Sequence, residues 1–286
     1  MANYNIKDLQ KVMLKTLLVI DKVCKEHHLR YYIIAGTLLG AIRHKGFIPW
    51  DDDADIAMPD NDYQKLVKNW KKWLPINYEI IYSGNNSLYP QPFAKIQDAS
   101  TTVIEHDHLK YLGGAYVDIF SVNGVSDNKL LQKYQTFRYK FIDKLLYFKY
   151  RDPYRHGHSF DSWFILFMHA ILNKKKLHKK IDKILNEHTF DKSNYVLVFD
   201  DGYKCIVNKD VFGEPKEYEF MGYRLMGVAN YDTLLSKMYG NYMKIPPVEN
   251  RRQHNFKFLD LNHPYRYYKN EDPLKKDQNK LLNSCK

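Results

Sequence analysis

The sequence has little cysteine, and this excludes two classes of small protein. Its 286 residues contain three cysteines, Cys24, Cys205 and Cys285, which lie far apart. An odd, scattered set of three cannot build a disulfide scaffold or a cysteine-rich zinc site, and it is typical of a reducing compartment. Hydrophobic residues make up 44% and charged residues 27% of the chain, which indicates a globular rather than a disordered protein.

Long apolar runs are also missing. The longest, residues 163–172 (WFILFMHAIL), is interrupted by His169 and has about half of the ~20 residues that span a bilayer. The first residues, MANYNIKD, lack the apolar segment of a signal peptide. We therefore expect a cytoplasmic protein that is soluble or lies peripherally at the inner membrane face.

Positive charge is abundant and unevenly distributed. Lys and Arg outnumber Asp and Glu by 44 to 33, a net charge of +11, and residues 129–183 alone hold 14 basic and 4 acidic residues. A solvated helical face is one interpretation; contact with an anionic membrane or with acceptor phosphates is the other. No helix-turn-helix, RRM-like or zinc-finger pattern is present, so we expect no nucleic-acid partner.

Hydrophobic periodicity predicts an α/β (α+β) protein with four segments. A helix over 6–29 precedes short strands and a helix that Asp60 or Asn61 caps and that ends near residue 73. Further strands are expected at 78–82, 93–97, 101–105, 115–122 and 195–199, with a hairpin over 218–228 and a helix over 231–243. The segments are a catalytic core (1–125), a basic aromatic-rich helical segment (126–190), a C-terminal part that completes the domain (191–263) and a polar tail (264–286).

Residues 49–56 (PWDDDADI) are the sharpest feature. An alternating strand would place Asp53 and Asp55 on one face, where adjacent carboxylates suit a hard divalent cation such as Mg²⁺. Asp51 and Asp52 are expected to be solvated or to support those ligands. The alternative is a solvated acidic turn, but such turns rarely continue as an alternating strand.

Two further elements support a phosphate and metal site. Gly36 and Thr37 follow a predicted strand, where the backbone can approach a phosphate closely. Asp118 interrupts an apolar strand, and a shared metal would offset the cost of burying it. This ordered trio has the rough spacing of the nucleotidyltransferase (polymerase β-like) fold, in which three carboxylates bind Mg²⁺. We therefore expect that core with a mixed sheet and a helical, basic insertion.

Residues 36–53 (GTLLGAIRHKGFIPWDDD) resemble the signature of the LicD family, phosphocholine transferases of bacterial cell-surface glycans. The resemblance continues at 93–96, 101–105, 114–120 and 239–243. It implies CDP-choline as donor and a sugar hydroxyl of a teichoic acid or surface-polysaccharide precursor, in this family a lipid-linked one, as acceptor. The fukutin-related enzymes share the core, so ribitol or glycerol phosphate transfer stays open, as does transfer of a nucleotide to a small molecule.

The resemblance also implies roles for single residues. Asp53, Asp55 and Asp118 would be catalytic and would bind Mg²⁺ or Mn²⁺, and a second set would hold the donor: Gly36, Thr37, Arg43 and Lys95. Arg43 either clamps the donor diphosphate or pairs with the Asp residues. Lys95 points to the cleft or to solvent, and the resemblance favours the cleft.

Overall fold

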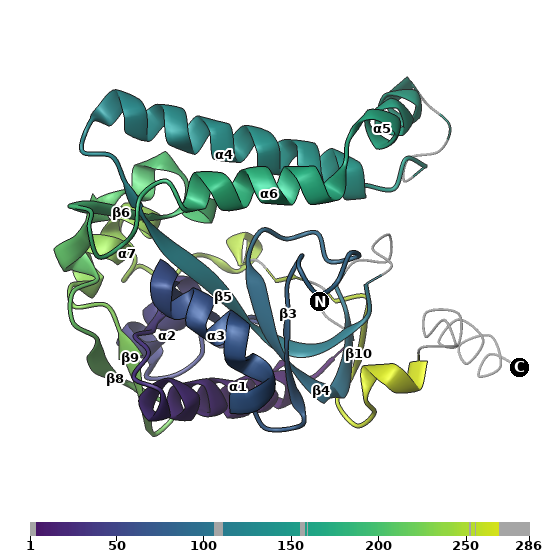
Figure 1. Cartoon of the computed structure of the whole chain (residues 1–286). Coiled ribbons are helices and arrows are strands. Elements are labelled where there is room, and N and C mark those ends of the chain that lie inside the picture. Colours follow the sequence, from purple (N-terminus) through teal and green to yellow (C-terminus); the bar gives the residue numbers. More distant parts are fainter. Residues whose placement is uncertain are drawn as a thin grey trace, which may run out of the picture.

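The computed structural model describes residues 4–105, 111–154, 158, 160–251, 253–254 and 256–268. They form a mixed β-sheet with α-helices packed on it (Figure 1). The α-helices are α1 (Ile6–Glu26), α2 (Ala35–His44), α3 (Asp60–Trp73), α4 (Lys129–Tyr150), α5 (Phe160–Ile171), α6 (Lys174–Leu185) and α7 (Tyr231–Tyr239). The predicted tail lies outside the described residues from residue 269 onward.

The strands and short 3₁₀ turns complete the fold. The strands are β1 (Tyr32–Ile33), β2 (Asp55–Pro59), β3 (Tyr78–Ile81), β4 (Ala94–Ile104), β5 (Gly113–Val125), β6 (Tyr195–Val198), β7 (Val207–Asn208), β8 (Lys216–Phe220), β9 (Tyr223–Gly227) and β10 (Phe258–Asp260). The 3₁₀ turns are η1 (Phe199–Asp201), η2 (Tyr203–Cys205), η3 (Lys209–Val211), η4 (Val248–Asn250) and η5 (Tyr265–Tyr268).

The sheet joins strands that are far apart in the sequence. Its main order is β10-β4-β5-β2-β1-β9-β8, with β3 paired to β4, and β6 paired to β5 and β7. The pairs β2–β5 and β1–β9 are parallel and the others are antiparallel. The sheet is therefore mixed, as the sequence predicts, and β5 pairs with three strands, β4, β2 and β6.

Asparagine side chains cap the starts of α1, α4, α6 and α7. α1 begins where the Asn5 side chain accepts a hydrogen bond from Lys7 N at 3.0 Å, and it buries Leu9, Met13 and Leu17 along one face. The predicted cap of α3 is wrong, because Pro59 occupies that position. The Asp60 carboxylate instead accepts from Phe190 N at 3.1 Å and ties a distant loop to the helix.

The basic segment forms a helical layer of its own. α4 and α6 lie side by side and α5 projects beyond them (Figure 1). Leu146, Ile181 and Leu197 belong to a second hydrophobic core between these helices and β6. No helix in the described part of the chain combines the length and the apolar character that a bilayer crossing requires.

The first predicted helix ends at Glu26 and the predicted hairpin spans 216–227, and two further differences from the predicted boundaries have a clear cause. The strands predicted at 93–97 and 101–105 are one strand, β4, whose pairing to β5 shifts register between Asp98 and Val103. An irregularity of this kind breaks the alternation that marks a strand in a sequence. The helix predicted over 231–243 ends at Tyr239, because Gly240 adopts a φ of 66°.

Candidate active site

Two parallel neighbouring strands bring the predicted carboxylates together. β2 and β5 pair so that Asp55 stands opposite Asp118, and β4 places Lys95 on the other side of Asp118. Directly paired residues share one face of a sheet. Three titratable side chains from three strands therefore meet on one face, with Asp55 9% and Asp118 8% exposed.

Lys95 is buried and fully engaged. Its Nζ lies 3.3 Å from Asp118 Oδ1 and 3.1 Å from Glu105 Oε2, and 3.3 Å from the centre of the Tyr116 ring. With only 2% of its surface exposed, Lys95 points to the carboxylates and not to solvent. It links two acidic side chains and holds Asp118 in place.

Asp51 and Asp53 approach the same place from the preceding loop. Asp53 lies before β2, so the shared strand face predicted for Asp53 and Asp55 does not describe it; its Oδ2 lies 3.7 Å from His254 Nδ1. Asp51 lies against Gly36, where an added Cβ would stand 2.6 Å from Asp51 Oδ2. We call Asp51, Asp53, Asp55 and Asp118 the carboxylate cluster.

Burial and mutual repulsion dominate the electrostatics of the carboxylate cluster. Burial, and then the charges of Asp53 and Asp118, raise the pKa of Asp55 well above its usual range. Burial raises the pKa of Asp118 to about 7 although Lys95 opposes the shift. Burial and the neighbouring Asp53 raise the pKa of Asp51 to about 8. A proton or a cation would therefore stabilise the cluster.

Asp52 has a structural role. It is 1% exposed, accepts a hydrogen bond from Tyr4 Oη at 2.6 Å and accepts another from His254 N at 3.0 Å. Of the two roles expected for Asp52, the solvated one is therefore wrong, and the supporting one stays a prediction. Asp52 fastens the segment around residue 254 beside the carboxylate cluster.

The residues predicted to hold the donor have different surroundings. Gly36 and Thr37 lie in the first turn of α2, and Thr37 Oγ1 accepts a hydrogen bond from Asp55 N at 2.8 Å, which fixes the start of β2. Arg43 Nη1 donates to Tyr242 O at 2.7 Å. Within the described residues Arg43 has no ion pair with the carboxylate cluster, so the ion-pair alternative is wrong.

Sequence reasoning missed Asp201. It lies in η1, directly after β6, where burial and the charge of Asp200 raise its pKa to about 7. Its charge is also among those that raise the pKa of Asp55, so it contributes to the same negative field. The available signal was an Asp-Asp pair at the end of an apolar strand.

The side chains of the carboxylate cluster are not arranged around a common point. Within the described stretches of the chain, no three His, Cys, Asp or Glu side chains are arranged so that they could jointly hold a metal ion. The strands fix the backbones of Asp55 and Asp118, and side-chain rotation is the freedom that remains.

Comparison with known proteins assigns a family to this part of the chain. Residues 28–154 match the family model described as LicD/FKTN/FKRP, nucleotidyltransferase domain. The chain is 28% identical over 272 residues to the lipopolysaccharide cholinephosphotransferase LicD of Haemophilus influenzae, covering 89% of this chain and 97% of that protein. An uncharacterized protein of Rickettsia prowazekii is 39% identical over 57 residues, about a fifth of each chain. The chain therefore carries a LicD family domain, and this domain contains the carboxylate cluster.

Proposed function

We propose that this protein is a phosphocholine transferase that moves phosphocholine from CDP-choline to a sugar hydroxyl of a teichoic acid or surface-polysaccharide precursor. The observation that carries the proposal is the carboxylate cluster, in which Asp55 and Asp118 stand in register on neighbouring strands. The similarity to a lipopolysaccharide cholinephosphotransferase over 97% of that protein supports the choice of phosphocholine.

Mg²⁺ or Mn²⁺ is the cofactor that we propose, held by Asp53, Asp55 and Asp118. The donor atoms fit in kind, because carboxylate oxygens are the ligands these hard cations prefer, but among the described residues the side chains do not converge on a shared point. Asp118 Oδ1 is buried without a hydrogen-bond donor of good geometry, although Lys95 Nζ lies 3.3 Å away. When bound, the cation would neutralise charge on the transferred phosphoryl group.

The chain's own residues would position the reactants. The Lys95–Glu105 ion pair holds Asp118, and the Thr37 hydroxyl holds the backbone of Asp55. The missing side chain of Gly36 lets the Asp51 carboxylate lie against the N-terminus of α2, where the backbone N–H groups of the first helical turn can also donate to a phosphate. Arg43 retains guanidinium donors for the donor diphosphate after its bonds to His44 and Tyr242.

The transfer needs one proton acceptor. The sugar hydroxyl oxygen attacks phosphorus, a new O–P bond forms, and the P–O bond to CMP breaks in line with it. A carboxylate of the cluster accepts the proton of the hydroxyl, and CMP leaves with the electron pair of the broken bond.

A lipid-linked acceptor suits the helical layer. On α5, Phe160 is 87%, Trp163 74% and Phe167 57% exposed, and Figure 1 shows this helix projecting from the molecule. α6 follows with three consecutive lysines at 174–176. Exposed rings beside lysines are typical of elements that enter an anionic lipid interface, so we propose that α5 and the start of α6 contact the inner membrane face.

Co-sedimentation with anionic vesicles at low salt tests this contact. Trp163→Asp is expected to reduce the bound fraction severalfold, because an exposed aromatic anchor is lost. The matched control is Ile76→Asp, which changes a 96% exposed apolar side chain outside the helical layer and is expected to leave binding unchanged. Equal binding by all three proteins would contradict the membrane proposal.

The activity is tested by incubating the protein with CDP-choline, Mg²⁺ and a lipopolysaccharide or teichoic acid preparation. We expect one CMP for each phosphocholine found on the glycan. Turnover of CDP-ribitol or CDP-glycerol in place of CDP-choline would change the assigned alcohol. Release of pyrophosphate from CTP without CMP would instead identify a nucleotidyltransferase that acts on a small molecule.

A further inference from the structure

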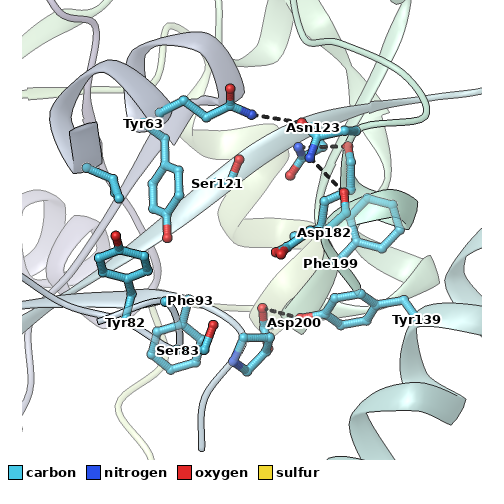
Figure 2. Close-up of a pocket in the computed structure, with 16 residues that line it drawn as sticks. Tyr63, Tyr82, Ser83, Phe93, Ser121, Asn123, Tyr139, Asp182, Phe199 and Asp200 are labelled. Carbon is cyan, nitrogen blue, oxygen red and sulfur yellow. Dashed lines mark hydrogen bonds between the residues drawn. The ribbon is translucent and has the colours of Figure 1, made fainter. Parts of the chain in front are cut away.

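We propose that a cavity between α3 and the helical layer binds a small organic cation that carries a protonated amine. The cavity has a volume of about 320 Å³ and lies between α3, β5, α4, α6, η1 and the loop that joins β3 to β4 (Figure 2). This volume is at the lower end of the range for small-molecule sites. The proposal is independent of the phosphocholine transfer proposed above.

The cavity lies on the other side of the sheet from the carboxylate cluster. Asn123 and Ser121 line it from β5. Residues an odd number of positions apart on a regular strand point to opposite faces, and both are an odd number of positions from Asp118. Pairing of β5 to β2 and β6 is regular over this stretch. The cavity is therefore a separate site and not an extension of the cluster.

The charged groups that line the cavity are acidic. Asp200 lies in η1 and Asp182 on α6. Among the described residues no Lys, Arg or His lines the cavity; Lys140 lies nearby, and its Nζ donates to the main-chain oxygen of Asp200 at 2.8 Å. The Asp200 carboxylate accepts one hydrogen bond, from Tyr139 Oη at 2.9 Å. Two carboxylates without a lining base favour a cationic ligand.

Asn123 supplies an independent reason for a ligand with N–H donors. Its side chain is 1% exposed, and Figure 2 shows its amide at the cavity wall. Nδ2 donates to Leu185 O at 2.9 Å, whereas Oδ1 has no hydrogen-bond partner. A buried acceptor without a donor is costly, and a protonated amine in the cavity would satisfy it.

The aromatic side chains that line the cavity indicate an organic cation rather than a metal ion. Five rings line the same space: Tyr63, Tyr82, Phe93, Tyr139 and Phe199. Ring faces attract organic ammonium groups, whereas a bare metal ion needs several converging oxygen ligands. Among the described residues only two carboxylates, those of Asp182 and Asp200, line the cavity.

Ligand-observed NMR titration with ethanolamine tests the site, with choline as the comparison probe and without any nucleotide donor. We expect saturable binding of ethanolamine, and binding of choline that is severalfold weaker because its quaternary nitrogen has no N–H. Asp200→Asn and Asp182→Asn keep the side-chain shape and should each weaken ethanolamine about tenfold. Asp210→Asn removes the same charge from an exposed position outside the cavity and should change nothing.

The Asp55→Asn variant separates this proposal from the proposed activity. It should retain ethanolamine binding whatever it does to transfer. Absence of saturable ethanolamine binding, or unchanged binding in both Asp200→Asn and Asp182→Asn, would overturn the cavity proposal. Choline binding as tight as ethanolamine would overturn the requirement for an N–H donor, and loss of binding in Asp55→Asn would assign the amine to the carboxylate cluster.

Discussion

The carboxylate cluster and the helical layer of α4, α5 and α6 differ in the sign and in the burial of their charges. The cluster gathers negative charge into a buried place, where burial and repulsion raise the pKa values of Asp51, Asp55 and Asp118. The helical layer spreads positive charge over its exposed surface, beside uncovered rings such as Trp163. The buried carboxylates lower the stability of the folded protein until a cation or proton binds. The exposed positive charges of the helical layer are solvated and change the stability little.

The difference shows why net charge is a poor guide to the chemistry here. The excess of +11 arises almost entirely in the helical layer, far along the sequence from the acidic motif. The proposed site for transfer depends on the carboxylate cluster, with Asp53, Asp55 and Asp118 as the proposed cation ligands, and the positive charge bears on what approaches the molecule. The predictions below test the buried charge of the cluster against exposed or solvated charge elsewhere in the molecule.

The largest expected effect is on transfer by Asp55→Asn. Loss of one proposed cation ligand should lower CMP release on the order of 10²–10³-fold, while removal of a repelling buried charge should leave the folded protein as stable as before or more stable. The measurements are the rate of CMP release and the unfolding temperature. Asp161→Asn, at an exposed position of α5, should keep wild-type activity; full activity in Asp55→Asn would remove Asp55 from the mechanism.

Replacing Lys95 should affect stability most. Lys95→Met leaves Glu105 and Asp118 facing each other without the buried cation between them, and such a loss costs roughly 3–5 kcal/mol in the free energy of unfolding. Urea denaturation measures it. Lys65→Met is the control, because Lys65 pairs with Asp62 from an exposed position and should cost about 0.5 kcal/mol or less. Equal costs for both variants would contradict the buried role of Lys95.

The contact between Gly36 and Asp51 predicts a coupled pair. Gly36→Ala places a Cβ 2.6 Å from Asp51 Oδ2, so the Asp51 side chain must move and destabilisation of about 1–3 kcal/mol is expected. Asp51→Ala in the same chain should restore most of that loss, because the obstacle is gone. A double-mutant cycle on unfolding free energies measures the coupling, and additive effects would contradict the packing of Asp51 on Gly36.

The smallest effect concerns pH, and its sign differs between the two regions. In the helical layer, burial lowers the pKa of His178 to about 4, so the stability it contributes is lost as pH falls from the unfolded value of 6.5. From pH 7 to pH 5 this amounts to roughly 2 kcal/mol, and His178→Gln should remove that dependence. In the carboxylate cluster the sign is opposite. Burial raises the pKa of Asp118 to about 7, so the stability that its protonated form contributes is lost as pH rises through that value. Urea denaturation at several pH values separates the loss of stability at low pH from the loss at higher pH. If His178→Gln lost as much stability between pH 7 and pH 5 as the wild type, His178 would not be its cause.

Much of the carboxylate cluster could be predicted from the sequence, because its signals are local. Acidic residues that interrupt apolar strands are visible at Asp55 and Asp118, and the hydrophobic period places the strands. The pairing register that sets Asp55 beside Asp118 is a tertiary property. The same holds for Thr37, whose hydroxyl holds a backbone group 18 residues away.

Contacts between distant segments could not be predicted. The burial of Asp52 depends on Tyr4 and on His254, which are on either side of it by 48 and 202 residues. Asp201 joins the field at Asp55 only because β6 pairs with β5. The cavity at Asn123 exists because α3 and α6 meet over one face of the sheet, and no periodicity in the sequence predicts that meeting.

The most direct test of the central claim is removal and return of the divalent cation, followed by CMP release from CDP-choline in the presence of acceptor. A chelator should abolish release by the wild-type protein, and Mg²⁺ should restore it. Mg²⁺ should also raise the unfolding temperature of the wild type and leave that of Asp55→Asn unchanged. Full activity of the chelated protein, or an equal rise in both unfolding temperatures, would contradict the assignment of the carboxylate cluster as the cation-dependent centre of transfer.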